Sequence, residues 1–380
     1  MATTKRLKQC TLTGLLLTII VSAVIHYNQG LHITYTEAAL ETVKRPVRDG
    51  DSADHRKSQG WLLDTYSNAM TYDHANTQCK QVSKFIFIKT IKTGGSTTAN
   101  ILLRYGLKNN LTIAEDHEQI NNCPNFTAID YSASHRQYKR SLLENLVPNA
   151  KYLSILRSPY TQQRSVFHWF NFPRSLGNQT TFRQFVEHPE HYSDFIQIHH
   201  QHRNGQMWFM IPDFDMRRQA NVSYVQQAIT LLDKEFDLVL ILEYFDESLI
   251  LLRKLLCWEF DDILYHSVNV RNPTDVITPS MESSIRKWSN ADVLLYEHFN
   301  RTLWKKVNTY DGDFEDDLNK FRTRQQHASS QCTDSDVREV DSFCWRLFVN
   351  TYKLQRVALK KRSLQRNKIR NERRQKCRHV

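Results

Sequence analysis

The sequence predicts an α/β protein in which a central parallel sheet carries helices on both faces. Three short apolar runs rich in strand-forming residues, Phe85–Ile88, Tyr152–Leu156 and Phe236–Leu242, are each followed by a segment with helical spacing, the last of these at Asp246–Leu256. Almost continuous apolar runs are typical of buried parallel strands, and their alternation with helices predicts an open sheet covered on both sides. Ligands of such sheets bind beyond the carboxyl ends of the strands, so the loops after these runs are the candidate site.

The first run leads into a polar loop and then a helix. Residues Lys89–Thr98 contain two lysines, two glycines and five hydroxyl side chains, and Ala99–Tyr105 has helical spacing. Backbone N–H groups at such a turn converge on an anion, and the helix dipole favours negative charge there. Lys92 adds a mobile positive charge, so the loop is predicted to hold a phosphate or a sulfate. It is not a Walker A loop, because its lysine precedes the glycines. An ordinary strand-to-helix turn with surface lysines is the alternative.

The second run leads into a loop that begins with an arginine. Arg157 directly follows the strand, and Ser165 lies eight residues on, in the predicted helix Gln162–Phe170. A guanidinium is a planar fork that fits a phosphate bidentately, and a hydroxyl adds one more donor. The two side chains can meet one ligand only if the chain turns back at Ser158–Pro159. We expect this loop and Lys92 to face a single crevice.

A short apolar run, Leu12–Ile25, follows a basic N-terminal segment. Basic residues on that flank predict that it stays cytosolic, so we expect a cytosolic tail at residues 1–10 and a signal-anchor transmembrane helix at 11–27. The run is short beside the roughly 20 residues of a typical span, and a cleaved signal peptide is the alternative. Either interpretation places the chain after Tyr27 in the lumen of the secretory pathway.

Three further segments are expected beyond the apolar run. Residues 28–80 are predicted to be a stem, because Glu41–Gly60 is polar and charged and cannot bury enough apolar surface to fold alone. Residues 81–310 are predicted to form the main α/β domain. Residues 311–380 are predicted to be a helical, basic C-terminal extension.

The positive charge of the chain is concentrated at its C-terminal end. Residues 344–380 hold 13 Lys or Arg and one acid, Glu372, a net charge of +12, whereas the whole chain carries +11. Such a tail fits anionic lipid or an acidic glycan. A luminal location excludes nucleic acid as its partner. A solvated helix that packs on the domain through Trp345, Leu347, Phe348 and Leu354 is the plainer alternative.

Sequons and cysteines agree with a luminal location. The five Asn-X-Ser/Thr sequons predict glycosylation at Asn110, Asn125, Asn178, Asn221 and Asn300. Six cysteines follow the apolar run, an even number that suits disulfides, with all 15 connectivities open: Cys79, Cys123, Cys257, Cys332, Cys344 and Cys377. No CxxC pair or His cluster has the spacing of a zinc site, so no structural metal is expected.

The two loops resemble those with which nucleotide-sulfate-dependent sulfotransferases hold their donor, and the chain resembles the galactose 3-O-sulfotransferase family of Golgi membrane enzymes. The similarity covers roughly residues 82–310, and the block that starts at Glu243 is its most specific part. The segments that carry it are Phe87–Thr97, Leu156–Pro159, Ser165–Phe167, Glu243–Leu249, Leu255–Glu259, Asp262–Tyr265 and Tyr296–Trp304.

The resemblance implies a P-loop-like sulfotransferase fold with the catalytic domain at 81–310. It implies transfer of the sulfonate of 3′-phosphoadenosine 5′-phosphosulfate to a hydroxyl, expected to be the 3-hydroxyl, of terminal galactose on a glycolipid or glycan. By position, the residues that would hold the 5′-phosphosulfate are Lys92, Thr93, Gly94, Gly95, Ser96 and Thr97. Those that would hold the 3′-phosphate are Arg157 and Ser165.

The first loop departs from the family pattern at one position. Members of the family often read Lys-Thr-His-Lys-Thr, and this chain has Ile91 at the place of that histidine. His135, within Ser134–Arg136, resembles a histidine that lies between the donor loops of related sugar sulfotransferases. We assign His135 as the general base, since a sugar hydroxyl must lose its proton as the S–O bond forms. Lys92 and loop N–H groups would stabilise the leaving oxygen, and no metal is required.

Two other functions stay open at this point. The first is a catalytically inactive relative that binds glycans, which the missing histidine at position 91 keeps in view. The second is a metal-dependent Golgi glycosyltransferase, for which Asp213-Phe-Asp215 and Asp311-Gly-Asp313 supply the Asp-X-Asp pattern. That pattern is short and frequent by chance.

Several other side chains are weaker candidates. The histidines at positions 199, 200 and 202 have no matching partners at metal-site spacing. Three large aromatic residues could stack on a sugar, although core packing is the default for such side chains: Trp169, Phe170 and Trp208.

Overall fold

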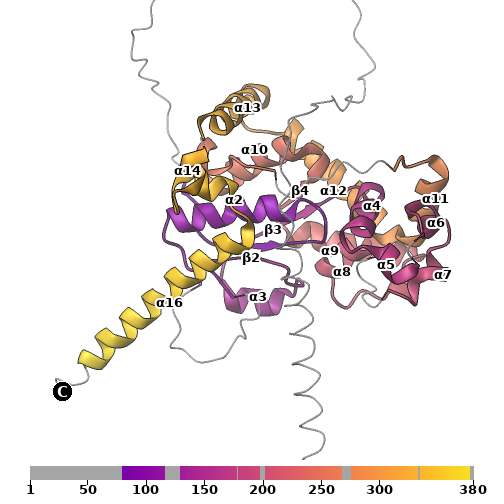
Figure 1. Cartoon of the computed structure of the whole chain (residues 1–380), viewed down its shortest axis with the longest axis horizontal. Coiled ribbons are helices and arrows are strands. Elements are labelled where there is room, and N and C mark those ends of the chain that lie inside the picture. The colour runs from indigo at the N-terminus through magenta and orange to yellow at the C-terminus, as the bar shows by residue number, and fades with distance from the viewer. Residues whose placement is uncertain are drawn as a thin grey trace, which may run out of the picture. The chain divides into compact units, whose positions relative to one another are not determined.

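The computed structural model describes residues 79–115, 129–177, 179–196, 202–267, 275–332 and 334–376. Its centre is a four-stranded parallel sheet in the order β2-β1-β3-β4 (Figure 1). The strands are β1 (Phe85–Ile88), β2 (Tyr131–Ser134), β3 (Lys151–Leu156) and β4 (Leu238–Ile241). The predicted parallel sheet is thereby confirmed.

Three of the strands coincide with the predicted apolar runs, with small differences at their ends. β4 is shorter than predicted because Phe236 caps the preceding helix and Leu242 opens a turn of 3₁₀ helix, η3 (Leu242–Tyr244). The fourth strand, β2, was not predicted. Its sequence, Tyr-Ser-Ala-Ser, contains two serines, yet all four residues of the strand are buried.

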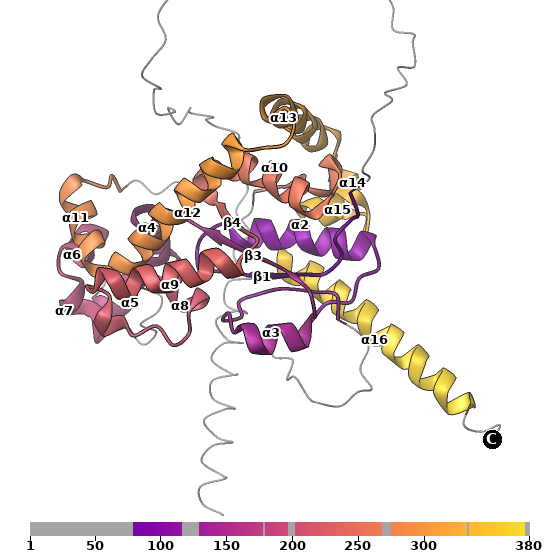
Figure 2. The ribbon, with the colours of Figure 1, turned by 180° about the vertical axis from the view of Figure 1, so that it is seen from behind.

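Each strand is followed by a helix, and helices cover both faces. The four helices are α2 (Gly95–Lys108), α3 (Arg140–Leu146), α4 (Pro159–Trp169) and α10 (Phe245–Leu256). Figures 1 and 2 show α2 on one side of the sheet and α3 on the other. The short sheet is therefore buried on both sides, and every residue of β1 is fully buried.

The remaining helices continue the chain around this centre. They are α5 (Phe172–Leu176), α6 (Phe182–Glu187), α7 (Pro189–Ser193), α8 (Gly205–Met210), η2 (Met216–Arg218), α9 (Val222–Glu235), η4 (Phe260–Asp262), α11 (Pro279–Trp288), α12 (Asn290–Asn308), α13 (Phe314–Gln331), α14 (Asp334–Arg338), α15 (Phe343–Phe348) and α16 (Thr351–Lys376). Helix α16 packs against α2 (Figure 2).

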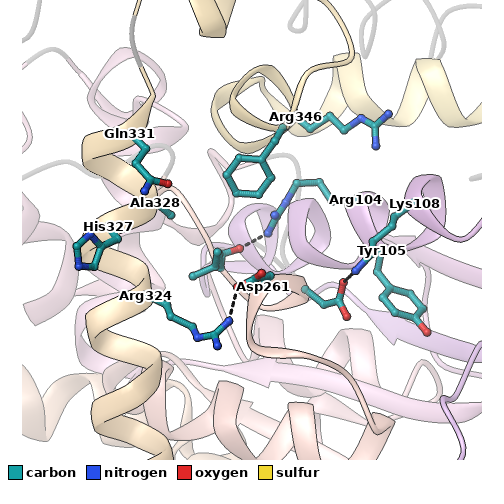
Figure 3. A pocket seen from close by; sticks show the side chains of 12 residues that line it. Arg104, Tyr105, Lys108, Asp261, Arg324, His327, Ala328, Gln331 and Arg346 are labelled. Atoms are coloured by element: carbon teal, nitrogen blue, oxygen red, sulfur yellow. Dashed lines mark hydrogen bonds and ion pairs between the residues drawn. The ribbon is translucent and has the colours of Figure 1, made fainter. Parts of the chain in front are cut away.

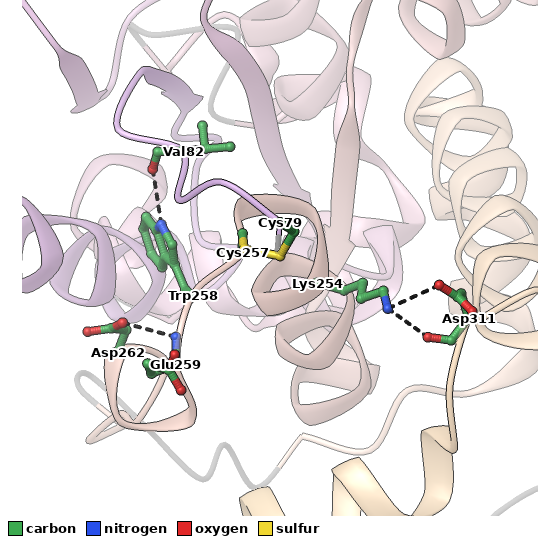
Figure 4. The surroundings of a disulfide bond; sticks show 8 residues. All are labelled: Cys79, Val82, Lys254, Cys257, Trp258, Glu259, Asp262 and Asp311. Carbon is green, nitrogen blue, oxygen red and sulfur yellow. Dashed lines mark hydrogen bonds and ion pairs between the residues drawn. A yellow bond between two sulfur atoms is a disulfide. The ribbon is translucent and has the colours of Figure 1, made fainter. Parts of the chain in front are cut away.

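Two disulfides fasten the domain. Cys79 is bonded to Cys257, which joins the segment before β1 to the end of α10 (Figure 4). Next to it, the Trp258 indole donates to the carbonyl of Val82 at 3.1 Å. The second disulfide, Cys332–Cys344, joins the end of α13 to α15. The expectation of disulfides is confirmed for these four cysteines, and Cys123 and Cys377 lie outside the described residues.

The expected membrane anchor at 11–27, and the predicted stem as far as residue 78, also lie outside the described residues. Within the part that the structure does describe, no helix combines the length and the apolar character that a membrane span needs.

Candidate active site

The carboxyl ends of the parallel strands meet along one edge of the sheet. The last residues of β1 and β2 pair with each other, as do those of β3 and β4. Lys89, His135 and Arg157 are the first residues after β1, β2 and β3. The sheet therefore brings the two predicted donor loops and the predicted base to the same edge, where ligands of parallel sheets bind.

The loop between β1 and α2 is held from inside by two threonines. Thr90 and Thr93 are buried, and their hydroxyl oxygens lie 2.8 Å apart. The Thr90 hydroxyl also donates to the carbonyl of Ile155 in β3, at 2.5 Å. The Thr93 side chain thus stabilises the loop, and only its backbone is left to face a ligand.

Gly94 makes the turn into α2 possible. Its φ of 82° lies in the left-handed region, and a Cβ atom there would come within 2.5 Å of Leu242 Cδ1. A side chain at this position would therefore be excluded twice, by the backbone conformation and by the neighbouring loop. Among the described residues, no side chain caps the first turn of α2, and this turn contains no acidic residue. Its N–H groups and the positive end of the helix dipole suit an anion.

Lys92 lies on the outer side of this loop. Its Nζ is 3.5 Å from the centroid of the Trp169 ring, a cation–π contact. Its φ of 57° is also in the left-handed region. Trp169 ends α4, so one of the three candidate sugar-stacking aromatics instead contacts the predicted donor lysine in this structure.

Arg157 is the best-anchored residue of the site. A buried amide, that of Gln206 in α8, pairs with its backbone: Arg157 N–H donates to Oε1 and Nε2 donates to the Arg157 carbonyl, both at 2.9 Å. The guanidinium donates to the Thr161 hydroxyl at 2.9 Å and to the Lys92 carbonyl at 3.3 Å. The second contact shows that the two predicted donor loops touch each other.

Burial and a nearby acid set the electrostatics of Arg157. Burial lowers its pKa by removing hydration from the cation, whereas the charge of Glu243 opposes this shift. Glu243 follows β4 and accepts from the Ser158 N–H at 2.9 Å, at the start of α4. The second loop is thus tied to the third, and the guanidinium remains a cation that an anionic group can neutralise.

Ser165 lies on the face of α4 that meets the first loop. One turn before it, the Gln162 amide donates to the carbonyl of Ile91 at 3.1 Å. One turn after it, Trp169 contacts Lys92. Residues three and four apart share a helix face, so the half-buried Ser165 is directed towards the same loop.

His135 has a fixed ring orientation. Its Nδ1 is 2.8 Å from the carbonyl oxygen of Lys89. Because a carbonyl only accepts, Nδ1 carries the proton in the neutral ring, and Nε2 keeps a lone pair. The ring is exposed on one side and lies 5.7 Å from the Phe209 ring on another. Loss of hydration where the ring packs against the protein lowers the pKa of His135 well below its usual value, and the positive charges of Lys89 and Lys92 act in the same direction.

The position where related chains carry a histidine faces inward here. The Ile91 side chain is 8% exposed and belongs to the core, while its carbonyl accepts from α4. His135 therefore has the better access to this edge of the sheet.

The sequence does not mark the buried residues that fix the backbone of Arg157. Gln206 is fully buried, and the buried carboxylate of Asp292 accepts from the N–H groups of Gln206 at 3.1 Å and Met207 at 2.7 Å. Burial raises the pKa of Asp292 to about 7, against the opposing effect of these N–H groups. No local motif marks these residues, because their roles arise only when α8 and α12 meet.

The Asp-X-Asp segments have ordinary structural roles. Asp215 caps the 3₁₀ helix η2 and pairs with Arg217, and Asp313 caps α13. Asp311 is almost fully exposed beside Lys254. Across the described ranges, no group of three or more His, Cys, Asp or Glu could hold a metal ion.

The remaining candidates are dispersed. His202 is buried, and its carbonyl accepts from Gln163 and Trp288, whereas positions 199 and 200 lie outside the described residues. Phe170 is partly buried against the core, and Trp208 packs beside the Phe209 ring.

Three of the five predicted glycosylation sites fall on described residues. Asn110 and Asn221 are exposed, and the latter caps α9. Asn300 is half-buried within α12, and its Oδ1 is shielded from water. Asn125 and Asn178 lie outside the described residues.

These features define an α/β protein in which a glycine turn at a helix N-terminus and a half-buried arginine lie at one edge of a parallel sheet, an arrangement suited to an anion. Comparison with protein families makes the assignment more specific. Residues 1–346 match the family described as galactose-3-O-sulfotransferase, and the chain belongs to this family. The resemblance seen in the sequence is thereby confirmed.

Individual relatives are moderately similar. Galactosylceramide sulfotransferase of Bos taurus is 33% identical over 252 residues, which is 61% of this chain and 59% of the relative. Galactose-3-O-sulfotransferase 3 of Mus musculus is 34% identical over 246 residues, or 58% and 56% of the two chains. Galactose-3-O-sulfotransferase 2 of the same species is 28% identical over 276 residues, or 66% and 70%. The chain therefore spans less than two thirds of the galactosylceramide sulfotransferases that it matches.

Proposed function

We propose that the protein transfers the sulfonate of 3′-phosphoadenosine 5′-phosphosulfate to a hydroxyl of terminal galactose, the 3-hydroxyl, on a glycolipid or glycan. The observation that carries this proposal is the junction of the two loops, where the Arg157 guanidinium donates to the Lys92 carbonyl at 3.3 Å. Because the 3′-phosphate and the 5′-phosphosulfate of the donor are attached to one ribose, the donor needs two cationic sites close together. Family membership supports the same donor and the same class of acceptor.

In this proposal the first loop holds the 5′-phosphosulfate. The uncapped N-terminus of α2 supplies N–H donors, and the Ser96 and Thr97 hydroxyls lie in its first turn. Arg157, at the end of β3, and Ser165, in α4, hold the 3′-phosphate. The cofactor supplies an activated sulfonate, and these residues orient it and neutralise its charge.

His135 removes the proton of the acceptor. As the galactose oxygen forms its bond to sulfur, the bond between sulfur and the 5′-phosphate oxygen breaks. The proton passes to Nε2 of His135, and adenosine 3′,5′-bisphosphate leaves with the electron pair. Lys92 stabilises the charge that develops on the leaving oxygen. Lys, Arg and backbone N–H groups provide the positive field, so no metal is assigned to this scheme.

We further infer that the protein works in the Golgi lumen as a single-pass type II membrane protein. Two disulfides support an oxidising compartment, since such bonds are rare in the cytosol.

The test is transfer of radiolabelled sulfonate to a panel of galactosides by the full chain, with and without a chelator. Chelator-resistant labelling of a β-galactoside is expected. Lys92→Ala and His135→Ala should each lower kcat by about 10²- to 10⁴-fold, the usual effect of losing an oxyanion-type donor or a general base. Exposed Lys234→Ala and His191→Ala are the matched controls and should keep full activity.

Other outcomes have definite meanings. Labelling that survives His135→Ala would reject this base. Intact donor binding without labelling of any acceptor would favour an inactive glycan-binding relative. Sulfonate labelling that disappears with the chelator would reject the metal-free scheme, whereas no sulfonate labelling together with chelator-sensitive transfer from a nucleotide sugar would favour a metal-dependent glycosyltransferase.

A further inference from the structure

A cavity with basic and apolar walls lies away from the candidate active site. It has a volume of about 580 Å³ and lies between the C-terminal half of α2, the η4 turn, α13 and the start of α15. Figure 3 shows side chains of α13, among them Arg324 and His327, on one side and those of α2, among them Arg104, on the other. At 1.5 Å per helical residue, Arg104 is about 15 Å from the loop at the start of α2. The cavity is therefore separate from the proposed donor site.

A buried cation lines this cavity. Arg104 is 7% exposed, and its guanidinium donates to Asn100 Oδ1 at 2.9 Å and to the Leu264 carbonyl. In the described part of the chain, no carboxylate forms an ion pair with it. Burial lowers the pKa of Arg104 to about 10, although the charge of Asp262 opposes the shift. The cation has thus lost hydration that an anion in the cavity would replace.

Other basic side chains line the walls and are partly neutralised. Lys108 pairs with Asp262 at 2.6 Å, and Arg324 pairs with Asp261 at 2.9 Å. Arg346 also lines the cavity and pairs with Asp341 at 2.8 Å, so these three basic side chains each have an acidic partner. The arginine at 324 is half-exposed and keeps further N–H groups for a ligand.

The rim and the remaining walls are apolar. The Phe343 ring is 48% exposed, which is unusual for a phenylalanine, and it opens α15 beside the cavity. Tyr105 stacks on Trp258 with 3.6 Å between ring centroids. Leu264 and Ala328 complete the apolar lining. An exposed aromatic ring beside arginines is suited to a ligand with both an apolar face and a negative charge.

Both disulfides hold these walls in place. Phe343 precedes Cys344, and Gln331 precedes Cys332, so the second disulfide joins the two sides of the rim. Trp258 follows Cys257 of the first disulfide and supports Tyr105. A cavity between cross-linked elements keeps its shape without a ligand, which favours binding.

We propose that this cavity binds an acidic sugar unit, a monosaccharide ring that carries a sulfate or a carboxylate. The anion would face Arg104 and Arg324, and the apolar face of the ring would lie on Phe343. The binding goes beyond the proposed transfer reaction and does not depend on it. The alternative is that Arg104 only fastens α2 to the turn at Leu264.

The experiment is a calorimetric titration of the full chain in detergent micelles, with adenosine 3′,5′-bisphosphate present to occupy the donor site. The probes are the methyl β-galactoside bearing a 3-sulfate, N-acetylneuraminic acid, the neutral methyl β-galactoside and sodium sulfate. The acidic sugars are expected to bind at least ten times more tightly than the neutral galactoside. Variants on both sides of the proposed active site, Lys92→Ala at the donor and His135→Ala at the acceptor, should bind them equally well, which separates this cavity from the active site.

Three variants test the residues. Arg324→Ala and Phe343→Ser change exposed side chains and should weaken binding at least fivefold, and Arg104→Gln should weaken it further. Exposed Arg301→Ala on α12 is the matched control and should have no effect.

Each result decides the proposal. Preference for only one of the two acidic sugars identifies which anion is recognised and supports it. Equal binding of neutral and acidic galactosides, equal binding of sodium sulfate and the sulfated sugar, or unchanged binding by both Arg324→Ala and Phe343→Ser would each overturn it. The last two variants give the answer even if Arg104→Gln does not fold.

Discussion

At the scale of single residues, His135 depends on a backbone carbonyl for its chemistry. The Lys89 carbonyl, 2.8 Å from Nδ1, selects the tautomer that leaves Nε2 as the acceptor. Two lysines and the surrounding protein disfavour the imidazolium, so the pKa of the ring is lowered. A ring with a lowered pKa is unprotonated near neutral pH and free to accept a proton at Nε2, although it is a weaker base than a histidine paired with Asp or Glu.

This shift predicts an unusual pH profile. Because kcat/KM reports the free enzyme, it should stay flat between about pH 6 and pH 8 and lack the usual histidine inflection near 6.5. The unfolded state takes up a proton near the ordinary value whereas the folded ring does not, so His135 should also lower stability as pH falls below that value. Initial rates and thermal unfolding measured across this range check both effects. An ascending limb centred near 6.5 that depends on His135 would contradict the prediction.

Gln206 predicts a second effect at residue scale. Gln206→Leu removes the amide that pairs with both backbone groups of Arg157, at 2.9 Å each. Losing buried hydrogen bonds of this kind costs about 1–3 kcal/mol, so the KM for the sulfate donor should rise by about 5- to 150-fold. Because Gln206 is a positioning residue, kcat at saturating donor should fall much less. Exposed Gln226→Leu on α9 is the control, and an equal loss in kcat without a change in donor KM would refute the positioning role.

The sequence marks candidate residues in the loops that follow strands and does not mark those that support them. Lys92 and Arg157 could be proposed from the sequence because a strand, a polar turn and a helix are local patterns. Gln206 lies 49 residues from Arg157, and Asp292 lies 86 residues from Gln206. Their contacts depend on how α8 and α12 pack, which no spacing rule encodes.

At the scale of elements, the C-terminal helix supports the start of α2. The Thr351 hydroxyl, at the start of α16, donates to the Ser96 carbonyl at 2.9 Å. Asn100 of α2 donates to the carbonyls of Arg346 and Val349, at 3.2 Å each. These contacts connect a segment beyond the family match, which ends at residue 346, to the predicted donor loop.

Because of these contacts, a substitution in α2 and a substitution at the start of α16 should both weaken donor binding. Asn100→Ala leaves two backbone carbonyls without their donor and should destabilise the fold by about 1–3 kcal/mol. Thr351→Val should have a smaller effect on stability, and both should raise the donor KM. Denaturant unfolding and donor titration measure these effects, with exposed Lys353→Ala on α16 as the control. Wild-type donor affinity in both variants would show that α16 does not support the loop.

Element prediction succeeded where hydrophobic patterns are strong. Of the four side chains expected to pack the C-terminal extension on the domain, Leu347 and Leu354 are completely buried, whereas Trp345 and Phe348 are half-buried. The expected single helix is divided into α15 and α16. Strand β2 was missed because Tyr-Ser-Ala-Ser has weak strand character and is buried only through its pairing with β1. Its absence from the prediction hid the fact that His135 directly follows a strand, as Lys89 and Arg157 do.

At the scale of the whole molecule, the disulfide between Cys79 and Cys257 encloses all four strands. The bond joins residues 178 positions apart, whereas Cys332–Cys344 joins residues 12 positions apart. Cross-links stabilise mainly by restricting the unfolded chain, and the effect grows with the enclosed length.

The two disulfides should therefore differ in their contribution to stability. Replacing both cysteines by serine is expected to lower the free energy of unfolding by about 5 kcal/mol for the long loop and about 3 kcal/mol for the short one. Denaturant titration of the two double variants measures the difference. A larger loss from the Cys332–Cys344 pair would show that local packing, and not loop length, dominates.

Because Lys92 lies on the Trp169 ring, the fluorescence of this tryptophan should report whether the proposed donor site is occupied. A lysine that turns towards a bound phosphosulfate must leave the indole, which gives up a cation–π interaction of about 0.5–2 kcal/mol. The fluorescence of Trp169 should therefore change in proportion to the fraction of the protein that has bound the donor. Titrating the chain with adenosine 3′,5′-bisphosphate should shift its fluorescence, and Trp169→Phe should abolish that signal while leaving the binding measurable by calorimetry.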